Sequence, residues 1–220
     1  MFIIKKYKMY VAIALQSVAL AWCKTHGEAF NKLRVFFTKM IVKSSGTTIN
    51  LIGKIDKDAD IIIVNHQSML DIFVLEEAIG NDVRFIGRKG IMDIWPVSKI
   101  VNMVGHITVD QGDKRAIIKL LKDVKACQGK KVIIFPEGTR SRSGQIEKFE
   151  IGTKILVEKL NLKAQPIVIK NILDVYDESK KTAATGTVDI VALPLVSTDE
   201  EDWYEKVHQE MKTTYNAKAS

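Results

Sequence analysis

The stretch DIIIVNHQSMLD, residues 60–71, contains a strand pattern followed directly by a helix pattern. Four consecutive β-branched residues, from Ile61 to Val64, are typical of a short buried strand. The residues from Met69 to Ile79 then have the composition and length of a helix. A strand followed directly by a helix is the building unit of an α/β sheet. We therefore expect His66 at a strand-to-helix turn, at the edge of the sheet where the strand ends.

The same alternation of strands and helices continues along the chain after residue 46. Besides the segment above, helices are expected at Asp113–Cys127 and Ile151–Leu160, with a polar helix after Asp199. This alternation predicts an α/β fold with a mixed, largely parallel sheet covered by helices. The expected strands are residues 47–52, 60–65, 83–87, 106–109, 131–135, 165–169 and 187–193.

Length and composition fit one ordinary globular domain with a small appendage. The chain has 220 residues, of which 46% are apolar and 27% are charged. Its two cysteines are too few for a disulfide framework, which favours a reducing compartment. The four histidines do not form a cluster with metal-ligand spacing, so the sequence predicts no metal site.

The net charge of +7 lies in the N-terminal segment. Residues 1–43 carry eight basic side chains and one acidic side chain, whereas residues 44–220 carry 25 of each. A nucleic-acid-binding protein usually has its basic excess on the folded domain. A basic excess that coincides with an apolar segment instead favours an anionic membrane surface as the partner, and no nucleic acid.

The N-terminal segment has the pattern of two helices that lie on a membrane. Met9–Cys23 is uncharged but would form a helix of only about 22 Å, shorter than the roughly 30 Å hydrocarbon core. Residues 28–42 mix apolar and basic residues at helical spacing. We therefore expect residues 1–45 to be a membrane anchor, peripheral or monotopic, on the cytoplasmic face of the cell membrane, and residues 46–220 to be the α/β domain. A cleaved signal, a true span and ordinary core helices are the alternatives.

The pair formed by His66 and Asp71 requires a turn between its two members. Five residues rotate a helix by about 500°, which would leave the two side chains about 140° apart. Ser68, however, can cap a helix that begins after it, with Asp71 in the first turn. His66 then lies outside the helix and can reach the carboxylate, which would leave its other ring nitrogen as a base. A purely structural pairing is the alternative.

A second polar segment, IIFPEGTRSRSG at residues 133–144, also follows a predicted strand. Its backbone amides, hydroxyl groups and guanidinium groups are suited to binding phosphate oxygens. The alternative is a surface turn with solvated arginines.

The two segments together resemble the glycerolipid acyltransferase family. NHQSMLD looks like its N-H-x-x-x-x-D motif and FPEGTRS like its F-P-E-G-T-R-S motif, in the family's order and about 65 residues apart. The resemblance covers roughly residues 45–170 and is strongest to 1-acyl-sn-glycerol-3-phosphate acyltransferases. It implies that His66 is the general base and that Asp71 orients it. The residues it implies for substrate binding are Arg88, Glu137, Gly138, Thr139, Arg140 and Ser141.

The resemblance also implies the reaction and its partners. His66 would deprotonate the sn-2 hydroxyl of lysophosphatidic acid, and that oxygen would attack the thioester carbonyl of acyl-CoA or acyl-carrier protein. The product would be phosphatidic acid, and neither a bound cofactor nor a metal is implied. The expected partners are the lysophosphatidic acid in the membrane and the acyl donor.

Three positions depart from the family pattern. Gln111 stands where the family usually has an arginine that helps hold the acceptor phosphate, with Lys114 and Arg115 nearby. Arg88 replaces a common lysine, and Gly90 a common glutamate. The departures leave open an acyltransferase for another lysolipid, such as a lyso-ornithine lipid or a lysophospholipid. A non-catalytic protein that binds lipid surfaces is the alternative from another class.

Overall fold

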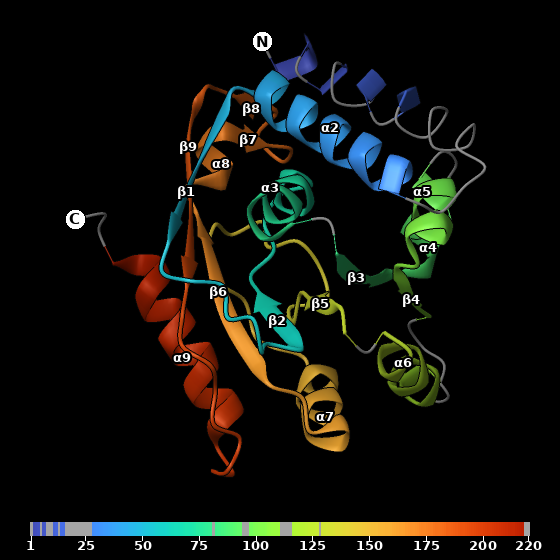
Figure 1. The fold of residues 1–220 in the computed structure, drawn as a ribbon. Coiled ribbons are helices and arrows are strands. Elements are labelled where there is room, and N and C mark those ends of the chain that lie inside the picture. The colour runs from blue at the N-terminus through green and yellow to red at the C-terminus, as the bar shows by residue number, and fades with distance from the viewer. Residues whose placement is uncertain are drawn as a thin grey trace.

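A seven-stranded sheet lies between two layers of helices in the computed structural model (Figure 1). The structure describes residues 2–4, 6–7, 11–12, 14–15, 28–80, 82–93, 97–110, 116–127 and 129–217.

The sheet has seven strands in the order β1-β9-β6-β2-β5-β3-β4. The five strands from β6 to β4 are parallel to one another, while β9 pairs antiparallel with β6 and parallel with β1. This confirms the expected mixed, largely parallel sheet. The strands are β1 (Thr47–Ile52), β2 (Ile61–Val64), β3 (Val83–Arg88), β4 (Ile107–Val109), β5 (Lys131–Ile134), β6 (Ala164–Lys170) and β9 (Gly186–Ala192).

Helices α3, α6 and α7 were expected with ends no more than three residues from the observed ones, and the polar C-terminal helix was also expected. Short helices and a two-stranded hairpin, β7 (Tyr176–Asp177) with β8 (Thr182–Ala183), were not predicted. The helices are α2 (Glu28–Ser45), α3 (Leu70–Ile79), α4 (Lys89–Met92), α5 (Val97–Val104), α6 (Ala116–Lys125), α7 (Ile151–Leu160), α8 (Ile172–Val175) and α9 (Trp203–Asn216).

Strand β2 lies at the centre of the sheet and is buried on both faces. Ile62 and Val64 pack into the core beneath α2, α3 and α8, whereas Ile61 and Ile63 pack into the core beneath α6, α7 and α9. Successive side chains of a strand point to opposite faces, so one apolar run supplies both cores. All four side chains are fully buried, and each buried isoleucine contributes about 1.5–3 kcal/mol relative to an exposed one.

Helix α2 packs on the α/β domain through the residues that were expected to face a membrane. Phe30 and Ile41 are buried in the protein. Arg34 is also buried, and its Nε lies 2.5 Å from Glu76 Oε1 on α3. Thr38 donates to the other oxygen of Glu76 at 2.9 Å. Residues 28–45 thus take part in the domain core, although the prediction assigned them to the membrane anchor.

The rest of the predicted anchor is described only in short pieces. Phe2 stacks on Tyr176 of β7 with 5.2 Å between ring centroids, which places this part of the chain beside the domain. Most of Met9–Cys23 lies outside the described residues. Within the described part of the chain, none of the helices combines the length and apolarity needed to cross a bilayer.

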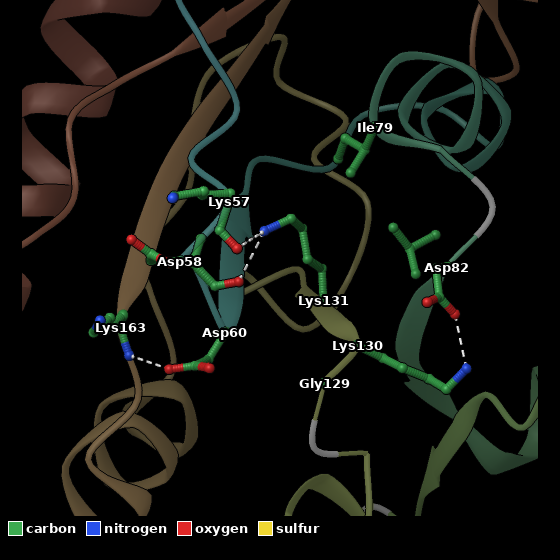
Figure 2. A pocket seen from close by; sticks show the side chains of 11 residues that line it. Lys57, Asp58, Asp60, Ile79, Asp82, Gly129, Lys130, Lys131 and Lys163 are labelled. Atoms are coloured by element: carbon green, nitrogen blue, oxygen red, sulfur yellow. Dashed lines mark hydrogen bonds and ion pairs between the residues drawn. The ribbon is translucent and has the colours of Figure 1, made fainter.

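The amino-terminal edge of the parallel strands is closed by ionic and backbone contacts (Figure 2). Lys131 Nζ at the start of β5 donates to the carbonyl oxygens of Asp56, Lys57 and Ala59. A cavity of about 420 Å³ lies at this edge of the sheet. Within its lining, Lys130 Nζ lies 2.7 Å from Asp82 Oδ1. These contacts fix the loop that feeds β2 at the edge opposite the predicted site.

Candidate active site

His66 lies directly beyond the carboxyl end of β2, where ligands bind in sheets of this kind. The preceding residue, Asn65, is buried and fixes the end of the strand to β6. Its side-chain amide donates to Ile169 O at 3.0 Å and its side-chain oxygen accepts from Ile169 N at 2.8 Å. Two hydrogen bonds to one residue set the direction in which the chain leaves the sheet, and hence the position of His66.

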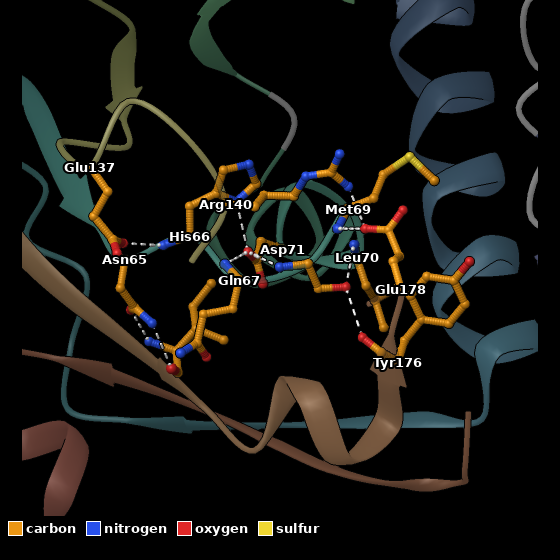
Figure 3. A network of polar contacts seen from close by, with 12 residues as sticks. Asn65, His66, Gln67, Met69, Leu70, Asp71, Glu137, Arg140, Tyr176 and Glu178 are labelled. Carbon is orange, nitrogen blue, oxygen red and sulfur yellow. Dashed lines mark hydrogen bonds and ion pairs between the residues drawn. The ribbon is translucent and has the colours of Figure 1, made fainter. Parts of the chain in front are cut away.

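Asp71 is fully buried in the first turn of α3 and accepts three hydrogen bonds through one oxygen (Figure 3). Its Oδ2 lies 2.8 Å from His66 Nδ1, 2.7 Å from Gln67 N and 2.9 Å from Ser68 N. This confirms that His66 folds back from outside the helix. The two backbone amides hold Oδ2 in place independently of the imidazole. The carboxylate can therefore orient the ring of His66.

The expected capping arrangement is present in modified form. Ser68 Oγ accepts from Leu70 N at 3.2 Å, one residue earlier than in the usual capping box, and donates to Tyr176 O at 3.1 Å. The reciprocal bond, from Ser68 N to the carboxylate of Asp71, is the one that the sequence predicted. The serine thus also fixes hairpin β7–β8 to the start of α3.

The remaining nitrogen of His66 is available for chemistry. Its Nδ1 is engaged by Asp71, and the ring stacks on Phe135 with 4.0 Å between centroids and an interplanar angle of 17°. About 15% of the side chain is exposed. If Nδ1 carries the proton that Asp71 accepts, Nε2 presents a lone pair, as a general base requires.

The other described histidines have structural contacts. His106 Nδ1 accepts from Phe85 N at 3.2 Å, and burial lowers the pKa of His106 to about 3. His208 Nε2 lies 2.9 Å from Glu147 O, and its ring packs on Phe149. Only His66, among the described histidines, has a carboxylate partner. The part of the chain that the structure describes contains no group of three or more His, Cys, Asp or Glu side chains able to hold a metal ion.

The FPEGTRS loop is bound to the backbone of His66 from two sides. Ser141 N donates to His66 O at 2.7 Å, and His66 N donates to Glu137 Oε1 at 2.7 Å. The second oxygen of Glu137 accepts from Glu147 N at 2.8 Å. The two motifs, about 65 residues apart in sequence, therefore form one unit. Glu137 and the Ser141 amide act as its cross-links.

Glu137 is the buried centre of this unit. Only 5% of its surface is exposed, and burial raises the pKa of Glu137 to about 7 in spite of the two amides, which lower it. The nearby negative charge of Asp71 raises the pKa further. An ionised carboxylate accepts most strongly from the two backbone amides, so these two bonds support the charged form in a site that otherwise disfavours it.

A cavity of about 360 Å³ opens beside this unit. Arg140 is 42% exposed and forms an ion pair with Glu178, which follows β7. Glu178 Oε2 also accepts from Met69 N, at the start of α3, at 3.2 Å. The cavity is thus lined both by guanidinium groups and by the carboxylates of Asp177 and Glu178. Its lining consists of Gln67, Thr139, Arg140, Ser141, Arg142, Leu173, Asp177, Glu178 and Ser179.

The structure places the predicted substrate-binding residues in different surroundings. Thr139 and Arg140 line the cavity with exposed side chains, and Gly138 provides the turn before them with φ 65°. The hydroxyl of Ser141 also borders the cavity but donates to Gln145 O at 2.6 Å. Glu137 lies behind the loop, as described above. Their roles in substrate binding stay predictions.

The predicted residues near β3 lie apart from this cavity. Arg88 is exposed at the carboxyl end of β3, which is the same edge of the sheet as His66 but two strands away from β2. Gly90 lies in α4. Gln111, Lys114 and Arg115 lie outside the described residues.

Sequence reasoning missed two residues that contact the site from distant elements. Tyr215 on α9 accepts from the side-chain amide of Gln67 at 2.9 Å, 148 residues away in sequence. Glu178 meets Arg140 from the loop of hairpin β7–β8. Neither belongs to a recognisable local pattern, so only the tertiary structure could identify them.

The fold and the site define an α/β protein in which a histidine oriented by a carboxylate lies beside a loop that carries Arg140. The chain belongs to the acyltransferase family, whose model, described as Acyltransferase, matches residues 48–170. It is 33% identical over 176 residues to a 1-acyl-sn-glycerol-3-phosphate acyltransferase of Helicobacter pylori, covering 78% of this chain and 74% of that protein.

Two further comparisons agree with this family. The chain is 26% identical to the human 1-acyl-sn-glycerol-3-phosphate acyltransferase beta, over 70% of this chain and 59% of that protein. The crystal structure of the 1-acyl-sn-glycerophosphate acyltransferase PlsC from Thermotoga maritima has the same fold, with a TM-score of 0.80 and 19% sequence identity. That match covers 100% of this chain and 96% of the PlsC chain.

Proposed function

We propose that this protein transfers a fatty acyl group from an acyl thioester to the sn-2 hydroxyl of 1-acyl-sn-glycerol 3-phosphate, giving phosphatidic acid for phospholipid biosynthesis. The observation that carries the proposal is the set of hydrogen bonds between the NHQSMLD and FPEGTRS motifs. The backbone of His66 is hydrogen-bonded to both Glu137 and Ser141, so the base is joined directly to the loop that carries Arg140. Relatives in the same family are named for this reaction.

The mechanism follows from the geometry of His66. Its Nε2 removes the proton from the acceptor hydroxyl while the oxygen attacks the thioester carbonyl, and Asp71 stabilises the imidazolium that forms. The tetrahedral intermediate then collapses, the carbon–sulfur bond breaks, and the leaving thiolate takes the proton from the His66 imidazolium, which restores the neutral base. The acyl group passes directly to the acceptor, without an acyl-enzyme. Acyl-CoA and acyl-carrier protein are both suitable donors.

We further propose that the guanidinium of Arg140 binds the phosphate of the acceptor. Arg140 lines the cavity with 42% of its side chain exposed, and a planar guanidinium can give two parallel hydrogen bonds to a phosphate. Replacing Arg140 by alanine should lower kcat/KM for lysophosphatidic acid by about tenfold to a hundredfold, mainly through KM. Steady-state assays on purified protein measure this effect.

A panel of acceptors provides the control for this prediction. A 1-acylglycerol without phosphate should react slowly and at the same rate with both proteins, because it has no group for Arg140 to bind. Lysophosphatidic acid should be preferred over lysophosphatidylcholine and a lyso-ornithine lipid, with acyl-CoA and acyl-carrier protein supplied as separate donors. Preference for the lyso-ornithine lipid, together with an unchanged KM in Arg140→Ala, would contradict the proposed acceptor.

We propose that the outer face of α2 lies on the anionic cytoplasmic leaflet of the membrane. Lys32, Phe36, Lys39 and Lys43 are exposed and spaced along one side of the helix. Three apolar residues near the N-terminus, Ile3, Ile4 and Tyr7, are also 60–80% exposed. An amphipathic basic surface of this kind binds at the lipid interface, with about 1 kcal/mol from each basic residue near the surface.

Substitution of the three lysines tests this surface without disturbing the core. Changing Lys32, Lys39 and Lys43 to glutamine should weaken binding to anionic vesicles by about a hundredfold at low salt, as measured by co-sedimentation. Deletion of α2 is unsuitable because it would remove buried Arg34. A control variant replaces three exposed lysines of α6 and α7 (Lys122, Lys125 and Lys159) with glutamine and should bind normally. Equal binding by both variants would refute the proposed surface.

A further inference from the structure

The ion pair between Arg140 and Glu178 occupies the group to which we assign the acceptor phosphate. Glu178 Oε2 accepts from the guanidinium and, at 3.2 Å, from Met69 N at the start of α3. An arginine and an amide at the N-terminus of a ten-residue helix are the donors of a typical phosphate site. Here the site already holds an anionic group, supplied by the protein itself (Figure 3).

Hairpin β7–β8 presents this carboxylate in a defined place. Asp177 Oδ1 accepts from Ser179 N at 2.8 Å, from Ser179 Oγ at 2.6 Å and from Lys180 N at 3.0 Å, which builds the turn around Glu178. The base of the hairpin is fixed by the bond from Ser68 Oγ to Tyr176 O. The backbone at Glu178 is thus held in position, whereas its side chain is 27% exposed and borders the open cavity.

A phosphate and this carboxylate cannot share the guanidinium without cost. Two negative groups about 4 Å apart repel each other, and Glu178 already holds the Nη1 donor of Arg140 on the side of the cavity. A phosphomonoester carries up to two charges and three acceptor oxygens, so it is the stronger partner for Arg140. When the phosphate takes over both Arg140 and Met69 N, the partly exposed side chain of Glu178 can rotate into solvent without a movement of its backbone.

We propose that Glu178 is an internal competitor that occupies Arg140 when no acceptor is bound and is displaced by the acceptor phosphate. This inference rests on the proposed function, because it assigns the acceptor phosphate to Arg140. Its consequence is an apparent affinity for the acceptor that equals the intrinsic affinity multiplied by the fraction of molecules in which the ion pair is open. The carboxylate therefore helps set the KM of the enzyme, while the base that sets kcat is separate.

The test is a double-mutant cycle on the binding of sn-glycerol 3-phosphate, the soluble head group. Glu178→Gln keeps the size of the side chain and removes its charge, and should lower Kd by about threefold to tenfold in calorimetric titration. The KM for lysophosphatidic acid should fall by the same factor. In the Arg140→Ala background, Glu178→Gln should have no effect on either quantity, because the competitor has lost its partner.

Asp174 provides the matched control because it is an exposed carboxylate on α8 in the same part of the chain. Asp174→Asn removes the same unit of charge and should change Kd by less than about twofold at physiological ionic strength. The proposal is overturned if Glu178→Gln weakens binding, which would mean that Glu178 positions Arg140, or if its effect equals that of Asp174→Asn. An effect that persists without Arg140 overturns it as well.

The reaction and the competitor can fail separately. If the wild-type protein does not acylate lysophosphatidic acid but Glu178→Gln still tightens head-group binding through Arg140, the proposed function is wrong and the competitor stands for another phosphate ligand. If lysophosphatidic acid is acylated normally and Glu178→Gln changes neither Kd nor KM, the competitor alone is wrong. Thermal melts of each variant confirm that it is folded.

Discussion

Replacing His66 by alanine should lower kcat for acyl transfer by about 10²- to 10⁴-fold, the range expected when a general base is lost. The fold should persist, because the contacts of His66 with Glu137 and Ser141 are made by its backbone. The imidazole also stacks on Phe135, so a loss of up to about 1.5 kcal/mol in unfolding free energy is expected. Single-turnover acyl transfer, measured beside thermal unfolding, separates the two effects.

His208 provides the control for this measurement. Its Nε2 lies 2.9 Å from Glu147 O, and glutamine can supply a comparable donor. His208→Gln should therefore retain the wild-type rate, although it too removes an imidazole. A folded His66→Ala protein with the wild-type rate would show that His66 is not the base and that the pair with Asp71 is structural.

The central part of the fold could be predicted from the sequence because local patterns determine it. An apolar run followed by a helix pattern predicts β2, α3 and the turn that carries His66. That turn explains how His66 can contact Asp71, five residues further along the chain. The same logic located all seven strands of the sheet. Helix α3 has no side-chain cap at Met69, yet Asp71 provides the acceptor that the S-x-x-D pattern predicted.

The features that could not be predicted depend on contacts between distant parts of the chain. The basic residues and apolar stripe of α2 suggested a membrane helix, but Arg34 is neutralised by Glu76 and lies inside the protein. Similarly, Glu137 has the sequence context of a ligand-binding loop, whereas both of its oxygens bind backbone amides. Nothing local in the sequence indicates that Glu178 will meet Arg140.

Substitutions of Asp71 should separate its effect on orientation from its effect on charge. Asp71→Ala leaves His66 Nδ1 and two backbone amides without their common acceptor, and should lower kcat by about 10²- to 10⁴-fold. The imidazole would then be free to rotate and to adopt either tautomer. This variant should also lose stability, because buried donors without an acceptor cost about 1–3 kcal/mol each.

Asp71→Asn should have a smaller effect on rate, for a reason that only the structure reveals. From sequence alone, an asparagine amide would be expected to donate to His66 and favour the wrong tautomer. The amides of Gln67 and Ser68 instead require an oxygen at the position of Oδ2, so the asparagine oxygen should remain there and still accept from His66 Nδ1. The new NH₂ group then takes the buried position of Oδ1, which has no hydrogen-bond partner among the described residues.

The two variants therefore differ in what they remove. Asp71→Asn keeps the tautomer and loses only the negative charge that stabilises the imidazolium, so we expect a decrease in kcat of about tenfold to a hundredfold. Its stability should still fall by about 1–3 kcal/mol, because the NH₂ group is buried without an acceptor. Single-turnover rates and melting curves for both variants measure these quantities. Equal, lowered rates for the Asp71→Asn and Asp71→Ala proteins would show that orientation is not the role of Asp71. Wild-type rates in both variants, with lowered stability, would show that Asp71 acts only as a helix cap.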